Sequence, residues 1–158
     1  GHYGAKEVTG VDISAFACEF ATENARLNGL ENVVHFVEAN AFDLLAEQSR
    51  AGVKYDVVIL DPPAFTKTRS AIEAATRGYK EINLRAMKMV KPGGYLITCS
   101  CSQHILPDAF MQIVRDAAHD AHVQLRQVEY RTQGRDHPIL PAAPETQYLK
   151  CGIFQIFD

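Results

Sequence analysis

The sequence lacks the features that mark several large classes of protein. It contains no apolar stretch of the roughly 20 residues needed to span a bilayer, no CxxC pair and no GxGxxG element that could bind a pyrophosphate. No charged-then-apolar leader opens it, and it has no internal repeat or low-complexity tract. These absences argue against a membrane protein, a disulfide-rich secreted protein and a nicotinamide-dependent dehydrogenase. We therefore expect a cytoplasmic protein with reduced cysteines and no membrane association.

Length and composition favour one domain with a substantial core. The chain has 158 residues, of which 47% are hydrophobic. Its net charge is −3, yet the stretch 66–91 holds seven basic residues against two acidic ones. A solvated helix face and a surface that binds nucleic-acid phosphates are both consistent with this basic cluster. Gly1 and His2 are interpreted as the remnant of an expression tag.

The alternation of short apolar runs with longer amphipathic runs predicts an α/β fold. The expected strands cover residues 7–11, 33–38, 55–60, 95–98, 123–131 and 149–157, and the expected helices cover 15–27, 42–51, 72–90 and 107–119. Ser14 is expected to cap the first helix, and the stretch 91–94, Lys-Pro-Gly-Gly, to form a turn. This order predicts a doubly wound, mostly parallel sheet with helices on both faces and an antiparallel hairpin at one edge.

The stretch YDVVILDPPAF, residues 55–65, combines a strand with a chemically distinctive ending. Its first six residues are apolar and rich in β-branched side chains, which is typical of a strand buried on both faces. Asp61 and two prolines end that strand abruptly, and Asp12 ends an earlier one. A strand-ending turn would explain the prolines. However, ligands bind at the carboxyl ends of strands in open α/β sheets, so the two acids also predict a binding site.

A cysteine-containing segment follows the next predicted strand. Consecutive parallel strands would place Asp61 beside residues 99–102, Cys-Ser-Cys-Ser, at one edge of the sheet. A thiolate there can add to C6 of a pyrimidine that is single-stranded or flipped out, which makes C5 able to attack an electrophilic methyl group. Cys101 lies just beyond the strand and is favoured as the nucleophile, whereas Cys99 continues the strand. A metal site at Cys99, Cys101 and His104 lacks a second ligand pair, so no metal is expected.

The sequence contains seven segments that together resemble a known family. They are VTGVDIS, ARLNGL, LDPPAF, RGYKEIN, KPGGYLITCSCS, DHPILP and PETQYLK. Between Ala5 and Phe157 the chain resembles the S-adenosylmethionine (SAM)-dependent 23S rRNA cytosine-5 methyltransferases, which have the Rossmann-like class I methyltransferase fold. The resemblance implies SAM as the cofactor and large-subunit rRNA as the partner. It also implies methyl transfer to C5 of a cytosine through a covalent adduct with Cys101.

The same resemblance implies roles for individual residues. The expected catalytic residues are Cys101 as nucleophile, with Asp61 and Pro62 lining the methyl-transfer site. The expected cofactor-binding residues are Asp12 for the ribose hydroxyls, Ile13 against the adenine, Asn40 and Ala41 at the adenine amino edge, and Asp61. The expected substrate-binding residues are Phe65, Arg77, Tyr79, Lys80 and His137.

Two parts of the family pattern are not found in the sequence. They are the N-terminal PUA-type RNA-binding domain and the first strand with its glycine-rich SAM loop, so we expect residues 3–158 to form a partial catalytic domain. In the family's strand order, 3-2-1-4-5-7-6, loss of strand 1 leaves unpaired edges between the strands ending at Asp12 and Asp61. We expect such a chain to bind SAM weakly or not at all. It would rearrange, form a homodimer or exchange strands to cover those edges.

Two other functions remain open from the sequence. One is methylation of a base nitrogen, because Asp61, the two prolines and Phe65 can hold an exocyclic amine without a cysteine. Replacing Cys101 by alanine would separate this chemistry from methylation at carbon. The other is a non-catalytic RNA-binding module, which the salt dependence of RNA binding without SAM would test.

Overall fold

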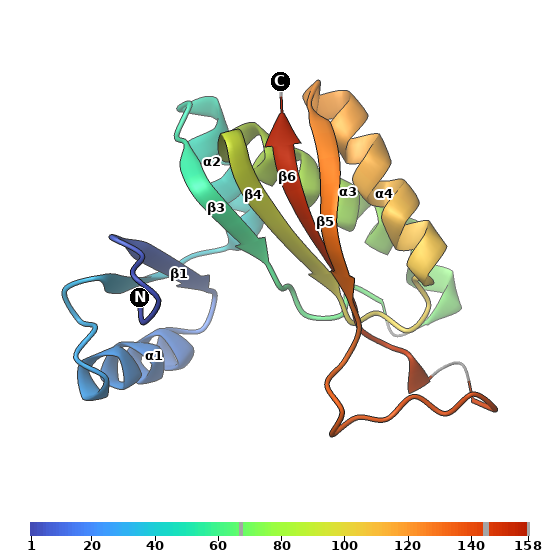
Figure 1. Ribbon diagram of the computed structural model, residues 1–158, viewed down its shortest axis with the longest axis horizontal. Coiled ribbons are helices and arrows are strands. Elements are labelled where there is room, and N and C mark those ends of the chain that lie inside the picture. Colours follow the sequence, from blue (N-terminus) through green and yellow to red (C-terminus); the bar gives the residue numbers. More distant parts are fainter. Residues whose placement is uncertain (67, 144–145, 158) are drawn as a thin grey trace. The chain divides into compact units, whose positions relative to one another are not determined.

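The computed structural model describes residues 1–66, 68–143 and 146–157, and the chain divides into two compact units, Gly1–Glu47 and Gln48–Asp158. Each unit is described by itself (Figure 1). The first unit holds β1 (Val8–Asp12), α1 (Ala15–Leu27), β2 (Val34–Glu38) and most of α2 (Ala41–Arg50). The second holds β3 (Tyr55–Leu60), the 3-10 helix η1 (Arg69–Ala71), α3 (Ile72–Met89), β4 (Val90–Ser100), α4 (Pro107–Ala121), β5 (Gln124–Arg131) and β6 (Lys150–Phe157).

In the first unit, two parallel strands pack with α1. Strands β1 and β2 pair in register from Val8 opposite Val34 to Asp12 opposite Glu38. Ser14 caps α1 as predicted, since its hydroxyl oxygen accepts the backbone N–H of Ala17 at 3.2 Å. After the helix, Gly29 adopts a φ of +66°, a conformation that glycine tolerates without steric cost. The local cap signals in the sequence thus set both ends of this helix.

The second unit contains a four-stranded sheet in the order β3-β4-β6-β5. Strand β3 is parallel to β4, while β6 runs antiparallel to both β4 and β5, which confirms the predicted antiparallel hairpin at the edge. The orders β2-β1 and β3-β4-β6-β5 also agree with strands 3-2 and 4-5-7-6 of the family order expected from the resemblance. Among the described residues, the two sheets are not joined by strand pairing.

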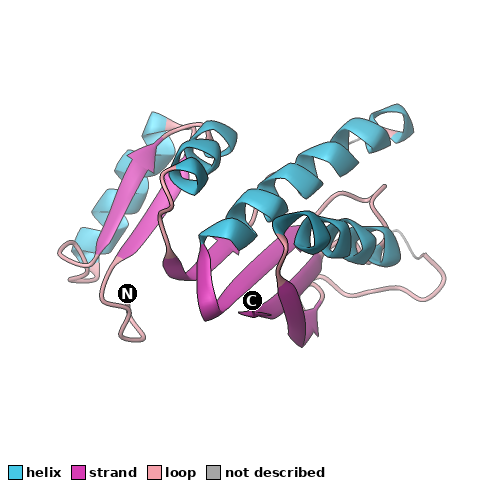
Figure 2. Ribbon diagram, turned by 90° about the horizontal axis from the view of Figure 1, so that it is seen from above, coloured by secondary structure: helices cyan, strands magenta, loops and turns pink. Residues whose placement is uncertain are grey.

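Helices α3 and α4 pack on each other and on one face of this sheet (Figure 2). The core between the helices and the sheet includes the fully buried side chains of Tyr79, Leu96, Phe110, Phe154 and Ile156. Each of these apolar residues loses its contact with water on folding, so this layer provides most of the unit's hydrophobic stabilisation. The ends of β3 and β4 are therefore held on a rigid support.

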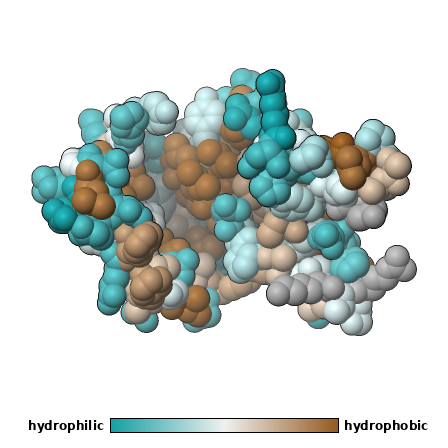
Figure 3. Space-filling view, turned by 90° about the horizontal axis from the view of Figure 1, so that it is seen from below, coloured by the Kyte–Doolittle hydropathy of each residue, from teal (hydrophilic) through white to brown (hydrophobic). Residues whose placement is uncertain are grey.

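The prediction that residues 55–60 form a strand buried on both faces is wrong. Val57 and Ile59 are 49% and 64% exposed, because β3 is the edge strand of its sheet and α3 and α4 cover the opposite face. Apolar patches are also visible on the molecular face drawn in Figure 3. Local sequence shows that such residues favour a strand, but which face is covered depends on distant elements.

The stretch 91–94 does not form the predicted turn but belongs to β4, which begins directly after α3. A register shift between Tyr55 and Val57 accommodates it, with Tyr55 opposite Val90 and Val57 opposite Tyr95. The close approach explains a glycine at position 94, since a Cβ there would lie 2.6 Å from the backbone oxygen of Asp56. Gly93 adopts a φ of +80°, so the two glycines together allow a bulged strand start.

Candidate active site

Parallel pairing brings the ends of β3 and β4 to one edge of the sheet. Leu60 lies opposite Thr98, so Asp61 follows β3 at the level where Cys99 and Ser100 end β4. The sequence-based prediction that Asp61 and the cysteine segment are neighbours is thereby confirmed. Asp61 is exposed and Cys101 is half-buried. The edge thus offers a carboxylate and a thiol that a ligand can reach.

Three parts of the fold converge on Ser102, the residue after Cys101. The buried Ser102 hydroxyl lies 2.9 Å from the hydroxyl of Tyr79 on α3, and it accepts the backbone N–H of Thr66 at 3.5 Å. The Ser102 carbonyl oxygen accepts a hydrogen bond of 2.7 Å from the ammonium group of Lys150 on β6. Buried hydrogen bonds of this kind restrict the backbone strongly. The position of Cys101 is therefore set by a well-anchored neighbour.

Tyr79, expected among the substrate-binding residues, lies beneath the surface. Its side chain is 0% exposed, and its ring centroid lies 4.4 Å from that of Phe65 and 5.8 Å from that of Phe110. Such offset and edge-on ring contacts are favourable. Tyr79 thus supports the loop after β3 and the Ser102 hydroxyl, instead of offering a contact surface. Phe65 is half-buried against it.

Lys150 is the residue of this edge that sequence reasoning missed. Its side chain is 1% exposed, and its ammonium group donates to the carbonyl oxygens of Ser102 at 2.7 Å and Tyr148 at 2.8 Å. Burial lowers the pKa of Lys150 to about 8, and the charge of Cys101 opposes that shift. The available signal was a lysine at the start of the mostly apolar strand KCGIFQIF, since buried lysines are rare.

Cys99 differs from Cys101 in its surroundings. It lies directly opposite Cys151 in the β4–β6 register. Burial, followed by the hydrogen bond with Cys151, raises the pKa of the Cys99 thiol to about 12, and the negative charge of Asp61 adds to the rise. Because the thiolate is the nucleophilic form, a thiol held protonated is a poor nucleophile. This difference supports Cys101 as the reactive cysteine.

In the first unit, the predicted cofactor-binding residues lie at the carboxyl ends of β1 and β2. Asp12 is exposed, and its Oδ1 accepts the Ser14 backbone N–H at 2.8 Å. Ile13 is 71% exposed. Asn40 and Ala41 are exposed at the start of α2, where the Asn40 Oδ1 accepts the backbone N–H of Phe42 at 2.9 Å. The two loops are adjacent, because the Ala39 N–H donates to the Asp12 carbonyl at 2.9 Å.

Most of the described cations of the basic cluster are paired with carboxylates. Lys67 lies outside the described residues, as does the Arg69 side chain. The ion pairs are Arg77 with Glu73, Lys80 with Asp120, Arg85 with Glu81 and Lys91 with Asp56. These pairs reduce the positive potential that the sequence suggested. Lys80 at 2.7 Å from Asp120 joins α3 to α4, and the contact raises the pKa of Lys80 and lowers that of Asp120.

His137 lies in the exposed loop between β5 and β6. Its Nδ1 is 3.1 Å from Asp136, and its ring contacts that of Tyr148 at a centroid distance of 6.1 Å. The contact with His137 lowers the pKa of Asp136. Tyr148 also accepts a hydrogen bond from Lys150 through its carbonyl oxygen, so this loop is tied to the start of β6. Such a position is compatible with a contact to substrate.

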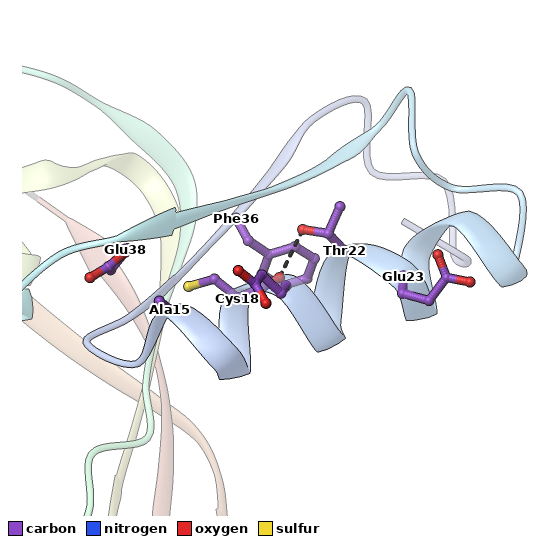
Figure 4. A pocket seen from close by; sticks show the side chains of 7 residues that line it. Ala15, Cys18, Thr22, Glu23, Phe36 and Glu38 are labelled. Atoms are coloured by element: carbon purple, nitrogen blue, oxygen red, sulfur yellow. Dashed lines mark hydrogen bonds between the residues drawn. The ribbon is translucent and has the colours of Figure 1, made fainter.

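A surface cavity of about 430 Å³ lies between α1 and β2 in the first unit (Figure 4). It is lined by Ala15, Cys18, Glu19, Thr22, Glu23, Phe36 and Glu38. The Thr22 hydroxyl donates to the Cys18 carbonyl oxygen at 2.8 Å and is thereby satisfied within the helix. None of the residues predicted from the sequence as site residues lines this cavity. We assign it no ligand.

Two features are absent from the described part of the chain, residues 1–66, 68–143 and 146–157. It contains no group of three or more side chains that could hold a metal ion. It also contains no helix that is both long and apolar enough to cross a membrane.

The chain matches one protein family and several known proteins in sequence. The family described as methyltransferase domain matches residues 2–144. The ribosomal RNA large subunit methyltransferase I proteins of Shewanella denitrificans and Aeromonas salmonicida are 44% and 45% identical to this chain over 148 residues. The alignment covers 93% of this chain but only 37% of each relative, so the chain spans little more than a third of their length.

Solved structures share the fold at low sequence identity. A methyltransferase crystallised with SAH covers 96% of this chain and 40% of its own, with a TM-score of 0.83 and 17% identity. A SAM-dependent methyltransferase from Streptococcus mutans covers 96% and 39%, with a TM-score of 0.82 and 18% identity. At this level of identity the likeness shows a common fold and no more.

Proposed function

We propose, since this chain belongs to the methyltransferase domain family, that the protein transfers a methyl group from SAM to C5 of a cytosine in large-subunit rRNA through a covalent adduct with Cys101. The rRNA substrate is supported by the names of the relatives at 44% and 45% identity. The chemistry at carbon is supported by one structural observation, the adjacency of Asp61 and the Cys99–Ser102 segment at the ends of paired parallel strands.

The residues at the ends of β1 and β2 fit the adenosine part of the cofactor. The exposed Asp12 carboxylate uses one oxygen to hold Ser14 and can accept bonds from ribose hydroxyls with the other. Ile13 offers an exposed apolar side chain on which an adenine ring can lie. Asn40 carries both a donor and an acceptor for the edge of that ring. When bound, SAM supplies an electrophilic methyl group on a positively charged sulfur.

The side chains at the end of β3 and β4 would then act on the cytosine. The Cys101 thiolate forms a bond to C6, and the electron pair of the C5–C6 double bond becomes available at C5. The Asp61 carboxylate can accept a hydrogen bond from N3 of the ring when N3 carries a proton from solvent, and that proton neutralises the charge that this addition creates. After C5 has formed its bond to the methyl group, a base removes the C5 proton. The electron pair restores the double bond and expels the Cys101 thiolate.

Substitution of each cysteine in the whole protein tests this proposal. Cys101→Ala should lower methyl transfer to 23S rRNA at least about 1,000-fold, because a nucleophile is not replaced by water. Cys99→Ala is the matched control, and it should retain turnover within about tenfold, because the half-buried Cys99 thiol, whose pKa is raised, stays protonated. The measurement is incorporation of a labelled methyl group, with the methylated nucleoside identified by mass spectrometry.

RNA that carries 5-fluorocytosine provides a second measurement. Fluorine at C5 cannot be removed as a proton, so the adduct with Cys101 should persist as a denaturation-resistant complex. That complex should form with the wild-type protein and with Cys99→Ala, and it should be absent with Cys101→Ala. Full activity of Cys101→Ala, with methylation at a ring or exocyclic nitrogen, would refute the carbon mechanism.

A further inference from the structure

Lys150 is a charged side chain enclosed by the protein at the edge that carries Cys101. It is 1% exposed, and a lysine in such a position is unfavourable unless its ammonium group is paired or hydrogen-bonded. Here the ammonium group donates to two carbonyl oxygens, those of Ser102 and Tyr148. Both are neutral acceptors, so neither neutralises its charge. The Lys150 ammonium group is therefore held at a defined point by two contacts, neither of which is with a carboxylate.

The register of the sheet places this cation next to Cys101. Lys150 lies opposite Ser100 in the antiparallel β4–β6 pair, and its Nζ is 2.7 Å from the carbonyl oxygen of Ser102. Cys101 lies between Ser100 and Ser102 in the sequence. The charges of Lys150 and Cys101 act on each other, with the thiolate favouring the protonated lysine.

We infer that Lys150 is a positioning residue for Cys101, whose buried ammonium group holds the Cys101–Ser102 segment in place and stabilises the thiolate form of Cys101. This inference rests on the proposed function, in which that thiolate attacks C6. When the thiolate forms, the thiol proton passes to solvent and Lys150 keeps its own proton. A nearby cation lowers the free energy of a thiolate in a partly buried site, where screening by water is weak.

Other titratable groups on or next to the neighbouring strands interact with the cysteines of this edge. They are Cys99 on β4, Cys151 on β6, Asp61 after β3, and Tyr130 and Arg131 on β5, which interact with Cys151. Asp61 carries negative charge and raises the pKa of Cys99, so it acts against thiolate formation at this edge. Lys150 is the buried cation that opposes it.

Thiol reactivity tests the inference without any need for methyl transfer. The 158-residue chain is treated with iodoacetamide between pH 6 and 9.5, and alkylation of Cys101 is quantified from peptide fragments. Lys150→Met should slow alkylation of Cys101 about tenfold at pH 7 and move its pH profile upward by about one unit. Lys54→Met is the matched control, because Lys54 also donates to a backbone carbonyl, that of Lys88 at 2.8 Å, but is exposed. It should change the rate less than twofold.

A second measurement keeps the inference testable if Lys150→Met does not fold. The ionisation of Lys150 is followed by NMR of its side-chain carbon in the wild type and in Cys101→Ala. By linkage, removal of the thiolate should lower the pKa of Lys150 further below about 8. An unchanged titration of Lys150, or equal alkylation rates in a folded Lys150→Met variant, would overturn the inference. If Cys101→Ala is inactive while Cys101 reacts normally in Lys150→Met, the inference fails and the proposed function stands. If Cys101→Ala is active, the proposed function alone fails.

Discussion

Replacing Tyr79 by phenylalanine removes one buried hydroxyl group and leaves the ring in place. The Tyr79 hydroxyl lies 2.9 Å from that of Ser102, and both side chains are 0% exposed, so water cannot replace the lost partner. Leaving a buried hydroxyl without one of its partners costs about 1–2 kcal/mol. With a urea dependence of about 1–3 kcal/mol per molar, the unfolding midpoint should fall by about 0.3–2 M.

The assay is urea unfolding followed by circular dichroism, with Tyr95→Phe as the matched control. Tyr95 belongs to the same sheet but is exposed, so this variant should change the free energy of unfolding by less than about 0.5 kcal/mol. The double variant with Ser102→Ala should reveal a coupling energy of about 1 kcal/mol between the two hydroxyl groups. A loss no greater than that of Tyr95→Phe, or a coupling energy near zero, would refute the role given to this hydrogen bond.

Four further changes should alter stability in directions set by the structure. His122→Gly should stabilise the chain by up to about 1 kcal/mol in urea unfolding, because His122 ends α4 with a φ of +57°. Gly94→Ala should lower the melting temperature, because its Cβ would lie 2.6 Å from the Asp56 carbonyl oxygen. Burial lowers the pKa of Lys150 to about 8, so between pH 8 and 10.5 the unfolded chain binds more protons than the folded chain. The contribution of Lys150 to the free energy of unfolding therefore rises with pH over this range, by up to about 3 kcal/mol. The pKa of Cys99 is raised from 9.0 to about 12, so its contribution to the free energy of unfolding falls as pH rises from 9 to 12. Unfolding of Cys99→Ala measured at several pH values should show no such fall.

The elements that the sequence predicted well carry their signals locally. The strand 55–60 has the predicted bounds, and α1 begins after Ser14 and ends before Asn28 and Gly29 as expected. A cap residue, a strand-ending Asp-Pro-Pro and a proline at the first turn of α4 act within a few residues of themselves. For the same reason the ends of β3 and β4, and with them Asp61 and Cys101, could be placed from the sequence.

Burial and side-chain partners could not be predicted in that way, because they depend on elements far apart in the chain. The pattern of residues 55–60 fits a strand covered on both faces and equally an edge strand covered on one, and only the position of α3 and α4 decides. Tyr79 was expected to contact substrate because it lies in the RGYK segment. In the structure its place on the inner face of α3 directs it to Ser102.

The arrangement around Cys101 depends on strand β6, which follows β5 in the sequence but lies between β4 and β5 in the sheet. This insertion places Lys150 beside a segment 48 residues earlier in the chain. An offset of one residue in the β4–β6 register would turn Lys150 to the other face of the sheet, because side chains alternate along a strand. The same register places Cys151 against Cys99. A single antiparallel pairing therefore determines both that Cys99 is held as a thiol and that Cys101 has a cation beside it, which distinguishes two cysteines that the sequence presents almost side by side.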